Sequence, residues 1–178
     1  MIRNDIDHVL ISEDELEKTV SRLAEEITRD YGRPDKNLVL LCILKGSIIF
    51  MSDLMKKLTI PVEIDCMRVS SYGSGTTSGG HIKIVLDLDR PDIRNCDLLI
   101  IEDIIESGLT MKEMLHILGE KKPKEVFITS LFVKPNCLKV DLKIDYRCFD
   151  IEDDFIVGYG LDYNHEGRNL PHIYQVIE

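Results

Sequence analysis

The sequence lacks the features by which several classes of protein are recognised. Its five cysteines are scattered and form no CxxC pair, which is typical of reduced thiols in a cytosol and predicts neither disulfides nor a zinc site. The longest apolar run, from Leu38 to Leu44, is too short to cross a bilayer, and the amino-terminal residues contain no signal-peptide core. The sequence also contains no GxxxxGK[ST] motif for nucleotide phosphates. These absences predict a cytoplasmic protein.

Positive charge is also scarce. The 178 residues carry 22 Lys and Arg against 32 Asp and Glu, a net charge of −10, which opposes non-specific attraction to nucleic acid or to an anionic membrane. An anionic ligand must therefore be held by a local cluster of cations. The length is that of about one domain, and no boundary or repeat divides residues 1–178.

Two wholly apolar runs predict the architecture. Residues 38–44 and residues 98–101 are apolar at every position, and each run leads into a short loop and a helix-like segment. Such runs suit strands that are buried on both faces, as in a parallel sheet. We predict an α/β fold with a mostly parallel central sheet flanked by helices. Further strands are predicted over residues 62–69, 81–86 and 126–133, and helices over residues 12–32, 48–58 and 111–119.

Residues 97–110, DLLIIEDIIESGLT, contain the most informative pattern. The apolar run ends in Glu102 and Asp103, and small residues follow at Ser107 and Gly108 before a predicted helix. Carboxylates at the carboxyl end of a strand lie where open α/β sheets bind ligands, and small residues entering a helix leave backbone N–H groups free for an anion. A phosphorylated sugar suits both. The alternatives are a solvated acidic loop and a Walker-B-like strand, which the missing phosphate motif opposes.

Residues 101–110, IEDIIESGLT, resemble the phosphoribosyl diphosphate (PRPP) binding motif of the type I phosphoribosyltransferases, in particular the hypoxanthine-guanine phosphoribosyltransferases. Four other stretches resemble this family in the same order, so the resemblance extends roughly from Leu38 to Tyr174. It implies the type I phosphoribosyltransferase fold with a small hood region from the chain termini. It also implies a purine-salvage enzyme that uses Mg²⁺ and converts PRPP and hypoxanthine or guanine to IMP or GMP and diphosphate. Family members are usually dimers or tetramers.

The resemblance assigns residues to the PRPP side of the site. The pair Lys45 and Gly46 would contact diphosphate, which in this family often involves an unusual peptide conformation. Ser71 and Tyr72 match a Ser-Tyr loop that closes over the site during reaction, although residues 70–80 taken alone also suit a flexible hairpin. The full set implied for PRPP binding is Lys45, Gly46, Ser71, Tyr72, Glu102, Asp103, Ser107, Gly108, Leu109, Thr110 and Arg168.

Residues 154–164, DFIVGYGLDYN, resemble the family's FVVGYALDYN segment, although aromatic residues beside glycine are more often core packing. The resemblance implies that Phe155 stacks on the purine, that the backbone near Val157 reads the base edge, and that Asp162 lies near base and metal. Lys134 would favour the 6-oxo group of hypoxanthine or guanine over the amino group of adenine, because an ammonium group only donates hydrogen bonds. The implied Mg²⁺ ligands are Glu102, Asp103 and Asp162.

Glu106 departs from the family pattern. The family usually has Asp at this position, placed to accept the N7 proton of the purine as general base, whereas Glu keeps the carboxylate and adds a methylene. We hypothesise that Glu106 still serves as the catalytic base. The change leaves open a non-catalytic regulatory protein that binds PRPP as a signal. A phosphorelay receiver domain fits less well, because the first apolar run leads into Lys45 instead of acidic residues.

Overall fold

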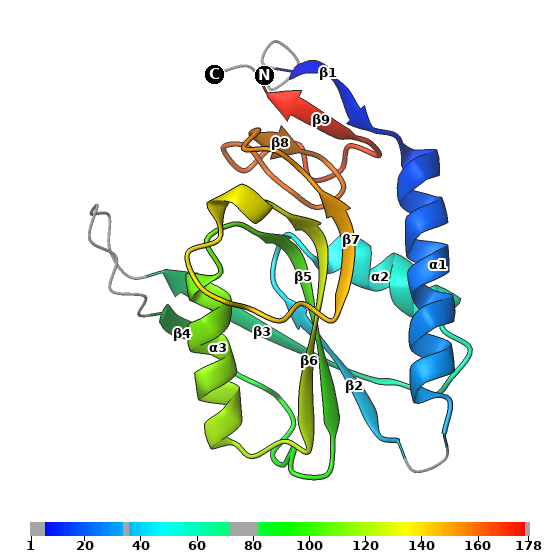
Figure 1. Ribbon diagram of the computed structural model, residues 1–178, viewed down its shortest axis with the longest axis vertical. Helices are drawn as coiled ribbons and strands as arrows, with labels where there is room; N and C mark the ends of the chain where they lie inside the picture. Colours follow the sequence, from blue (N-terminus) through cyan, green and yellow to red (C-terminus); the bar gives the residue numbers. More distant parts are fainter. Residues whose placement is uncertain (1–5, 34–35, 72–81, 177–178) are drawn as a thin grey trace.

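The computed structural model describes residues 6–33, 36–71 and 82–176, which form two β-sheets and three α-helices (Figure 1). The large sheet has six strands in the order β4-β3-β2-β5-β6-β7. Neighbouring strands are parallel except for the antiparallel pair β3 and β4, so the predicted α/β fold with a mostly parallel sheet is confirmed. The bounds are β2 Leu38–Ile43, β3 Glu63–Ser71, β4 Ile82–Leu86, β5 Asp97–Ile105, β6 Glu125–Val133 and β7 Tyr146–Asp150.

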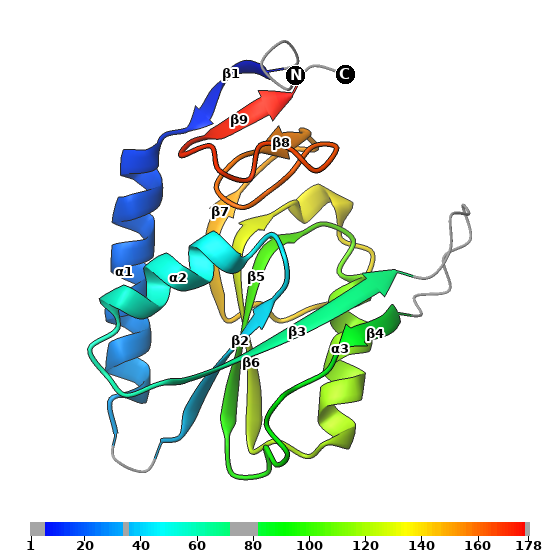
Figure 2. The same cartoon turned by 180° about the vertical axis from the view of Figure 1, so that it is seen from behind.

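Three helices cover the large sheet in the described residues. Helices α1 (Glu13–Tyr31) and α2 (Ile48–Lys57) lie on one side, and α3 (Leu109–Glu120) lies on the other, as Figures 1 and 2 show. The predicted capping box begins α1: Ser12 Oγ accepts the N–H of Glu15 at 3.3 Å, and the Glu15 carboxylate accepts the N–H of Ser12 at 2.9 Å. None of these helices in the described chain is long and apolar enough to span a membrane.

The residues of β2 explain why an apolar run forms a strand here. Successive side chains of a strand point to opposite faces of the sheet, and both faces of this sheet are covered. Alternate residues of β2 therefore pack into two separate cores, one with α1 and α2 and the other with α3. The first core contains Leu38, Leu40 and Cys42, and the second contains Val39, Leu41 and Ile43.

A small antiparallel sheet forms the predicted hood. Its strands β1 (Ile6–Ile11), β9 (Ile173–Val176) and β8 (Ile156–Val157) come from the two ends of the chain. Figures 1 and 2 both place this sheet beyond the end of the large sheet toward which β7 points, with α1 leading away from it. Because β7 is parallel to β6, the hood covers the carboxyl ends of the parallel strands.

One predicted boundary was wrong. The apolar run ends at Ile101, but β5 continues to Ile105, so Glu102 and Asp103 lie within the strand and not in a loop. Backbone pairing with β6 causes this extension, since Glu102 pairs with Ser130 and Ile105 with Val133. The loop before α3 is therefore only residues 106–108.

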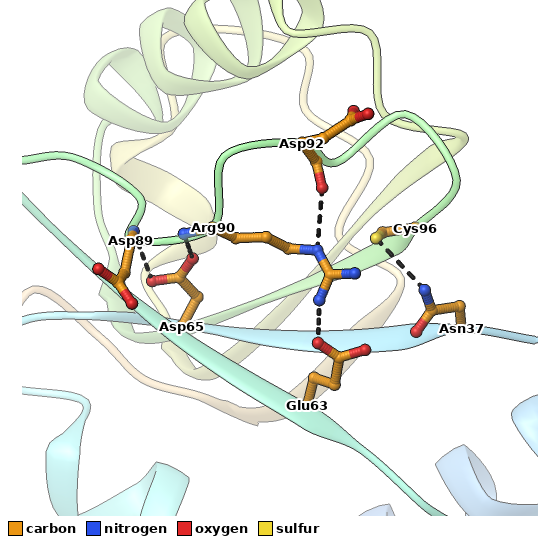
Figure 3. A network of polar contacts seen from close by, with 7 residues as sticks. All are labelled: Asn37, Glu63, Asp65, Asp89, Arg90, Asp92 and Cys96. Atoms are coloured by element: carbon orange, nitrogen blue, oxygen red, sulfur yellow. Dashed lines mark hydrogen bonds and ion pairs between the residues drawn. The ribbon is translucent and has the colours of Figure 1, made fainter.

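The loop that joins β4 to β5 is fixed against β3 by polar contacts (Figure 3). The buried carboxylate of Asp65 accepts the backbone N–H groups of Asp89 at 3.2 Å and Arg90 at 3.1 Å. The guanidinium of Arg90 in turn contacts Glu63 and donates to the carbonyl of Asp92. These bonds satisfy backbone groups that the sheet does not pair. They also hold in place the loop that leads to β5.

Candidate active site

The strand order places a ligand site beside β2. From β2 the chain crosses through α2 to β3 on one side, whereas β5 lies on the other side of β2. Open α/β sheets bind ligands at such a change of direction, outside the carboxyl ends of the strands. A cavity of about 270 Å³ lies at this edge. Its walls include Glu102, Glu106, Ser107, Gly108 and Thr110.

The loop of residues 106–108 presents main-chain groups to this cavity. Gly108 has a φ of 74°, and a Cβ there would lie 2.9 Å from Cγ2 of Val140, so the tight entry into α3 requires glycine. The hydroxyl of Ser107 accepts the N–H of Leu109 at 3.4 Å. The first turn of α3 contains no acidic residue, so the positive end of its dipole is available to an anion. The predicted residues of this loop are thus together at one helix start.

The Glu102 and Asp103 carboxyl groups contact each other. Burial raises the pKa of Glu102 well above its usual range, and the neighbouring charge of Asp103 raises it further. Asp103 also accepts the N–H of Ile104 at 2.8 Å. A buried carboxyl group beside a second carboxylate is stabilised in its charged form by a cation or by hydroxyl donors, and Glu102 with Asp103 fits both.

The loop after β2 lies against Asp103. The peptide bond between Leu44 and Lys45 is cis, at the place where the resemblance implies an unusual conformation. A Cβ on Gly46 would lie 1.4 Å from Oδ2 of Asp103, and a Cβ on Gly160 would lie 2.0 Å from the carbonyl oxygen of Gly46. Only glycine at both positions allows these three segments to meet. Lys45 is exposed beside this contact.

A buried ammonium group lies beside the cavity. Lys134 follows β6 and is only 5% exposed, and its Nζ is 2.6 Å from Oε1 of Glu106 and 3.2 Å from Oδ1 of Asp153. Burial alone lowers the pKa of Lys134, but the Glu106 and Asp153 carboxylates outweigh it and the pKa is raised. The same contact with Lys134 lowers the pKa of Asp153. Lys134 is therefore held as a cation, and Glu106 is its nearest acceptor.

The hood contributes an exposed aromatic ring and a short strand. Phe155 is 43% exposed, and its ring meets Tyr163 edge to face with centroids 5.5 Å apart. Val157 is buried in β8 and pairs with Tyr174 of β9, so only its backbone suits a role in recognition.

The predicted ligands Asp162 and Arg168 bind each other. Oδ1 of Asp162 is 2.5 Å from Nη2 of Arg168, whose Nη1 also donates to the carbonyl of Gly160 at 2.6 Å. The other carboxylate oxygen of Asp162 accepts the N–H of His165 at 3.0 Å. Arg168 is thus held beside the segment that contacts Gly46, whereas Asp162 is occupied by protein partners.

Glu102, Asp103 and Asp162 are the donors that the resemblance implies for Mg²⁺. Within residues 6–33, 36–71 and 82–176, no three His, Cys, Asp or Glu side chains converge closely enough to hold a metal ion. Mg²⁺ usually binds one or two carboxylates and completes its octahedron with water and substrate phosphate oxygens. Glu102 and Asp103 fit that mode. A direct role for Asp162 stays a prediction.

Two predicted residues cannot be compared with the structure, and two residues of the site were not predicted. The Ser71 side chain and Tyr72 fall outside the described residues, so the closing loop stays a prediction. Two residues of the site were missed, Asp153 and Gly160. Asp153 lies in an acidic run just before Phe155. This run reaches Lys134 because β7 pairs with β6, and strand β7 was not predicted from the sequence.

The fold and this constellation match a known family. A family model described as the phosphoribosyl transferase domain matches residues 11–164. The match covers most of the sheet and all the residues discussed above up to Asn164. The chain therefore belongs to the phosphoribosyltransferase family.

Individual relatives narrow this assignment. The chain is 46% identical over 169 residues to the hypoxanthine phosphoribosyltransferase of Buchnera aphidicola subsp. Schizaphis graminum, covering 95% of each chain. It is 44% identical over 173 residues to the hypoxanthine-guanine phosphoribosyltransferase of Bacillus subtilis, covering 97% of this chain and 94% of that protein. A crystal structure of a hypoxanthine phosphoribosyltransferase from Staphylococcus aureus superimposes with a TM-score of 0.92 at 43% identity, covering 98% of this chain and 93% of that one. Within the family, the chain groups with the hypoxanthine-guanine phosphoribosyltransferases, and these relatives give no support to a non-catalytic regulator.

The contact at Gly46 generates a first prediction. We expect Gly46→Ala to lower phosphoribosyl transfer by about 100-fold, because the methyl group must displace Asp103 or the loop, and misplacement of about 1 Å can cost that much. Gly119→Ala is the matched control, since a Cβ there meets nothing within 4 Å. Initial rates and thermal unfolding of both variants decide the matter. A folded Gly46→Ala enzyme with normal rates would show that this contact does not order the site.

Proposed function

We propose that this protein is a purine-salvage enzyme that transfers the 5-phosphoribosyl group from PRPP to hypoxanthine or guanine, giving IMP or GMP and diphosphate. The observation that carries the proposal is the pair of Lys134 and Glu106, 2.6 Å apart beside a phosphate-binding loop. A 6-oxopurine presents N7 and O6 side by side on one edge. A carboxylate acceptor and an ammonium donor at hydrogen-bond spacing complement that edge when N7 carries a proton.

The sugar half of the reaction develops positive charge, because bond breaking at the anomeric carbon gives an oxocarbenium-like transition state. Glu102 and Asp103 suit this half by holding the ribose hydroxyls, directly or through Mg²⁺. The bound Mg²⁺ would supply charge neutralisation of the diphosphate. The 5′-phosphate suits the start of α3, where Ser107 and Thr110 add hydroxyls to the backbone amides of residues 106–110.

The leaving diphosphate carries the negative half of the charge. Lys45 and Gly46 lie in the loop beside Asp103, and Gly160 brings Arg168 to the same region by accepting its guanidinium N–H. An exposed lysine and a guanidinium are suitable donors to phosphate oxygens. We assign the diphosphate to this group of residues.

The purine half uses the residues beside Lys134. Glu106 would accept the N7 proton as general base while Lys134 donates to O6. Phe155, which is 43% exposed, supplies a ring face on which the base can stack. The backbone near Val157 and Asp162 would read the remaining edge of the base, which distinguishes hypoxanthine from guanine.

The substrate assignment is tested by incubating the protein with PRPP, Mg²⁺ and one purine at a time while diphosphate release is followed. Hypoxanthine and guanine should each be converted to the nucleotide. Adenine should give at least about 100-fold less product, because its 6-amino group is a donor and offers the buried Lys134 ammonium no acceptor in place of Glu106. Binding of PRPP without turnover of any 6-oxopurine would contradict the proposal.

The base is tested by two substitutions at Glu106. We expect Glu106→Gln to lower kcat by about 100-fold or more, since an amide cannot accept the N7 proton. Glu106→Asp keeps the carboxylate and restores the residue usual in the family, so it should retain most of the activity. Single-turnover rates with hypoxanthine distinguish the two. Near-parental turnover by Glu106→Gln would remove this residue from the role of base.

We further propose that the protein acts in the cytoplasm as a homodimer or homotetramer. The scattered free cysteines suit a reducing compartment. Large apolar side chains are exposed on one helix and on two neighbouring strands, the edge strand β4 and β3 beside it, and such groups commonly mark interfaces between proteins. They are Ile48, Ile49 and Met55 of α2, Ile64 of β3, and Val85 and Leu86 of β4.

Assembly is tested at the most exposed of these residues. Ile64 is 58% exposed, and Ile64→Glu should shift the protein toward the monomer because a buried unpaired charge at an interface is costly. Val9→Glu is the control, since Val9 is 44% exposed but lies in the hood. Sedimentation velocity reports the mass of each variant. A wild-type protein that sediments as a monomer at micromolar concentration would contradict the proposed assembly.

A further inference from the structure

Lys134 has two carboxylate partners, whereas the proposed reaction uses only one of them. Its Nζ is 2.6 Å from Glu106 and 3.2 Å from Asp153. In the proposed reaction Glu106 turns from Lys134 to the N7 proton of the purine. Without Asp153, the 5% exposed Lys134 would then be left with O6 alone, and a buried ammonium without a charged partner is strongly disfavoured.

Asp153 is placed to remain with Lys134 during this exchange. It lies in the loop after β7, whereas Glu106 lies in the loop after β5. Its carboxylate also accepts a hydrogen bond from the thiol of Cys137, which ends the short 3-10 helix Pro135–Cys137. A second contact between the same two segments joins Asn136 to Glu152 at 3.5 Å. Asp153 is therefore fixed to the segment that follows Lys134 in the chain.

The position of Asp153 also connects the two sides of the base site. It precedes Phe155 by two residues, so the carboxylate that holds Lys134 belongs to the same loop as the ring that faces the base. An ammonium has three N–H donors. One can remain on Asp153 while another reaches O6, which fixes the direction of the ammonium relative to the Phe155 ring.

We propose that Asp153 is a positioning residue for 6-oxopurine recognition, holding the Lys134 ammonium toward O6 when Glu106 turns to the base. This inference rests on the proposed function and deepens it. Asp153 contacts neither PRPP nor the reacting atoms in this assignment. Its loss should therefore weaken binding of the base and leave the chemistry at saturating base largely intact.

The test compares Asp153→Asn with the wild-type enzyme. We expect the KM for hypoxanthine to rise about five- to tenfold, a moderate factor because the Asp153 side chain is 80% exposed. The kcat and the KM for PRPP should change less than about twofold. Affinity for IMP, measured by calorimetry, should fall by a similar five- to tenfold, and affinity for ribose 5-phosphate should not change.

Two matched variants separate position from charge. Asp153→Glu keeps a carboxylate next to Lys134 and should recover most of the hypoxanthine affinity. Glu152→Gln removes one negative charge from the adjacent residue, whose partner is Asn136 and not Lys134, and it should leave every constant near the wild-type value. A purely electrostatic effect of the acidic run would instead make Glu152→Gln resemble Asp153→Asn, which would overturn the proposal.

The pH profile gives a readout that a structural role would not move. The groups that face Lys134 are Glu106 from the loop after β5, Asp153 from the loop after β7, and Cys137 from the short helix. Removing the Asp153 carboxylate removes one of the two charges that raise the pKa of Lys134. Lys134 then loses its proton at lower pH, so the alkaline limb of kcat/KM for hypoxanthine should move to lower pH.

The outcomes are distinguishable from failure of the proposed function. If the wild-type protein binds IMP but Asp153→Asn shows unchanged IMP affinity and an unchanged alkaline limb, the role of Asp153 is excluded while the enzyme assignment stands. An equal loss of IMP and ribose 5-phosphate affinity would indicate general distortion and would also exclude it. A wild-type protein that converts no purine overturns the proposed function itself, and the role assigned here to Asp153 with it.

Discussion

The candidate site depends on a close contact among three segments of the chain. Two of these segments can approach so closely only because they present glycine, Gly46 and Gly160, at the contact. Asp103 of β5 lies where a Cβ of Gly46 would be, and Gly46 in turn lies where a Cβ of Gly160 would be. This contact joins the ends of two neighbouring parallel strands and attaches the hood segment to them. The fold thereby brings a carboxylate, an exposed lysine and the backbone near Arg168 into one region.

The charge of the site explains how an acidic protein can hold an anionic substrate. The chain has a net charge of −10, and carboxylates surround the cavity. The cations that we assign to the substrate, Lys45, Lys134 and Arg168, are few, so this assignment requires the main-chain amides at the start of α3 to carry much of the phosphate binding. Burial, and after it the neighbouring charge of Asp103, raises the pKa of Glu102, so the ionised form of Glu102 is disfavoured here. The same pair becomes favourable where substrate hydroxyls and a divalent cation meet it.

The fold was predictable where local pattern and tertiary structure agree. The apolar run of β2 predicted a strand because both faces of the sheet are covered, and the alternation of its residues between two cores confirms this reason. The end of β5 was not predictable, because hydrogen bonds to β6 and not hydrophobicity extend it through Glu102 to Ile105. The motif residues of the site were found by resemblance. Asp153 was missed because its place depends on β7, whose five residues are exposed or half-buried and form no apolar run of the kind that predicted β2.

Under the proposed assignment, the contact between Glu106 and Lys134 must open before a base can bind to both groups. In the structure Nζ of Lys134 is 2.6 Å from Oε1 of Glu106, so the two groups to which we assign O6 and the N7 proton satisfy each other. Binding of the base is then an exchange of partners, and its net free energy is the difference between two sets of hydrogen bonds. Under this assignment, a purine with an amino group at C6 also breaks the pair, but it can form only the hydrogen bond to Glu106 and not the one from Lys134. Under the roles proposed above, a base must open the pair of Glu106 and Lys134, and discrimination against a 6-aminopurine would follow from the cost of opening it.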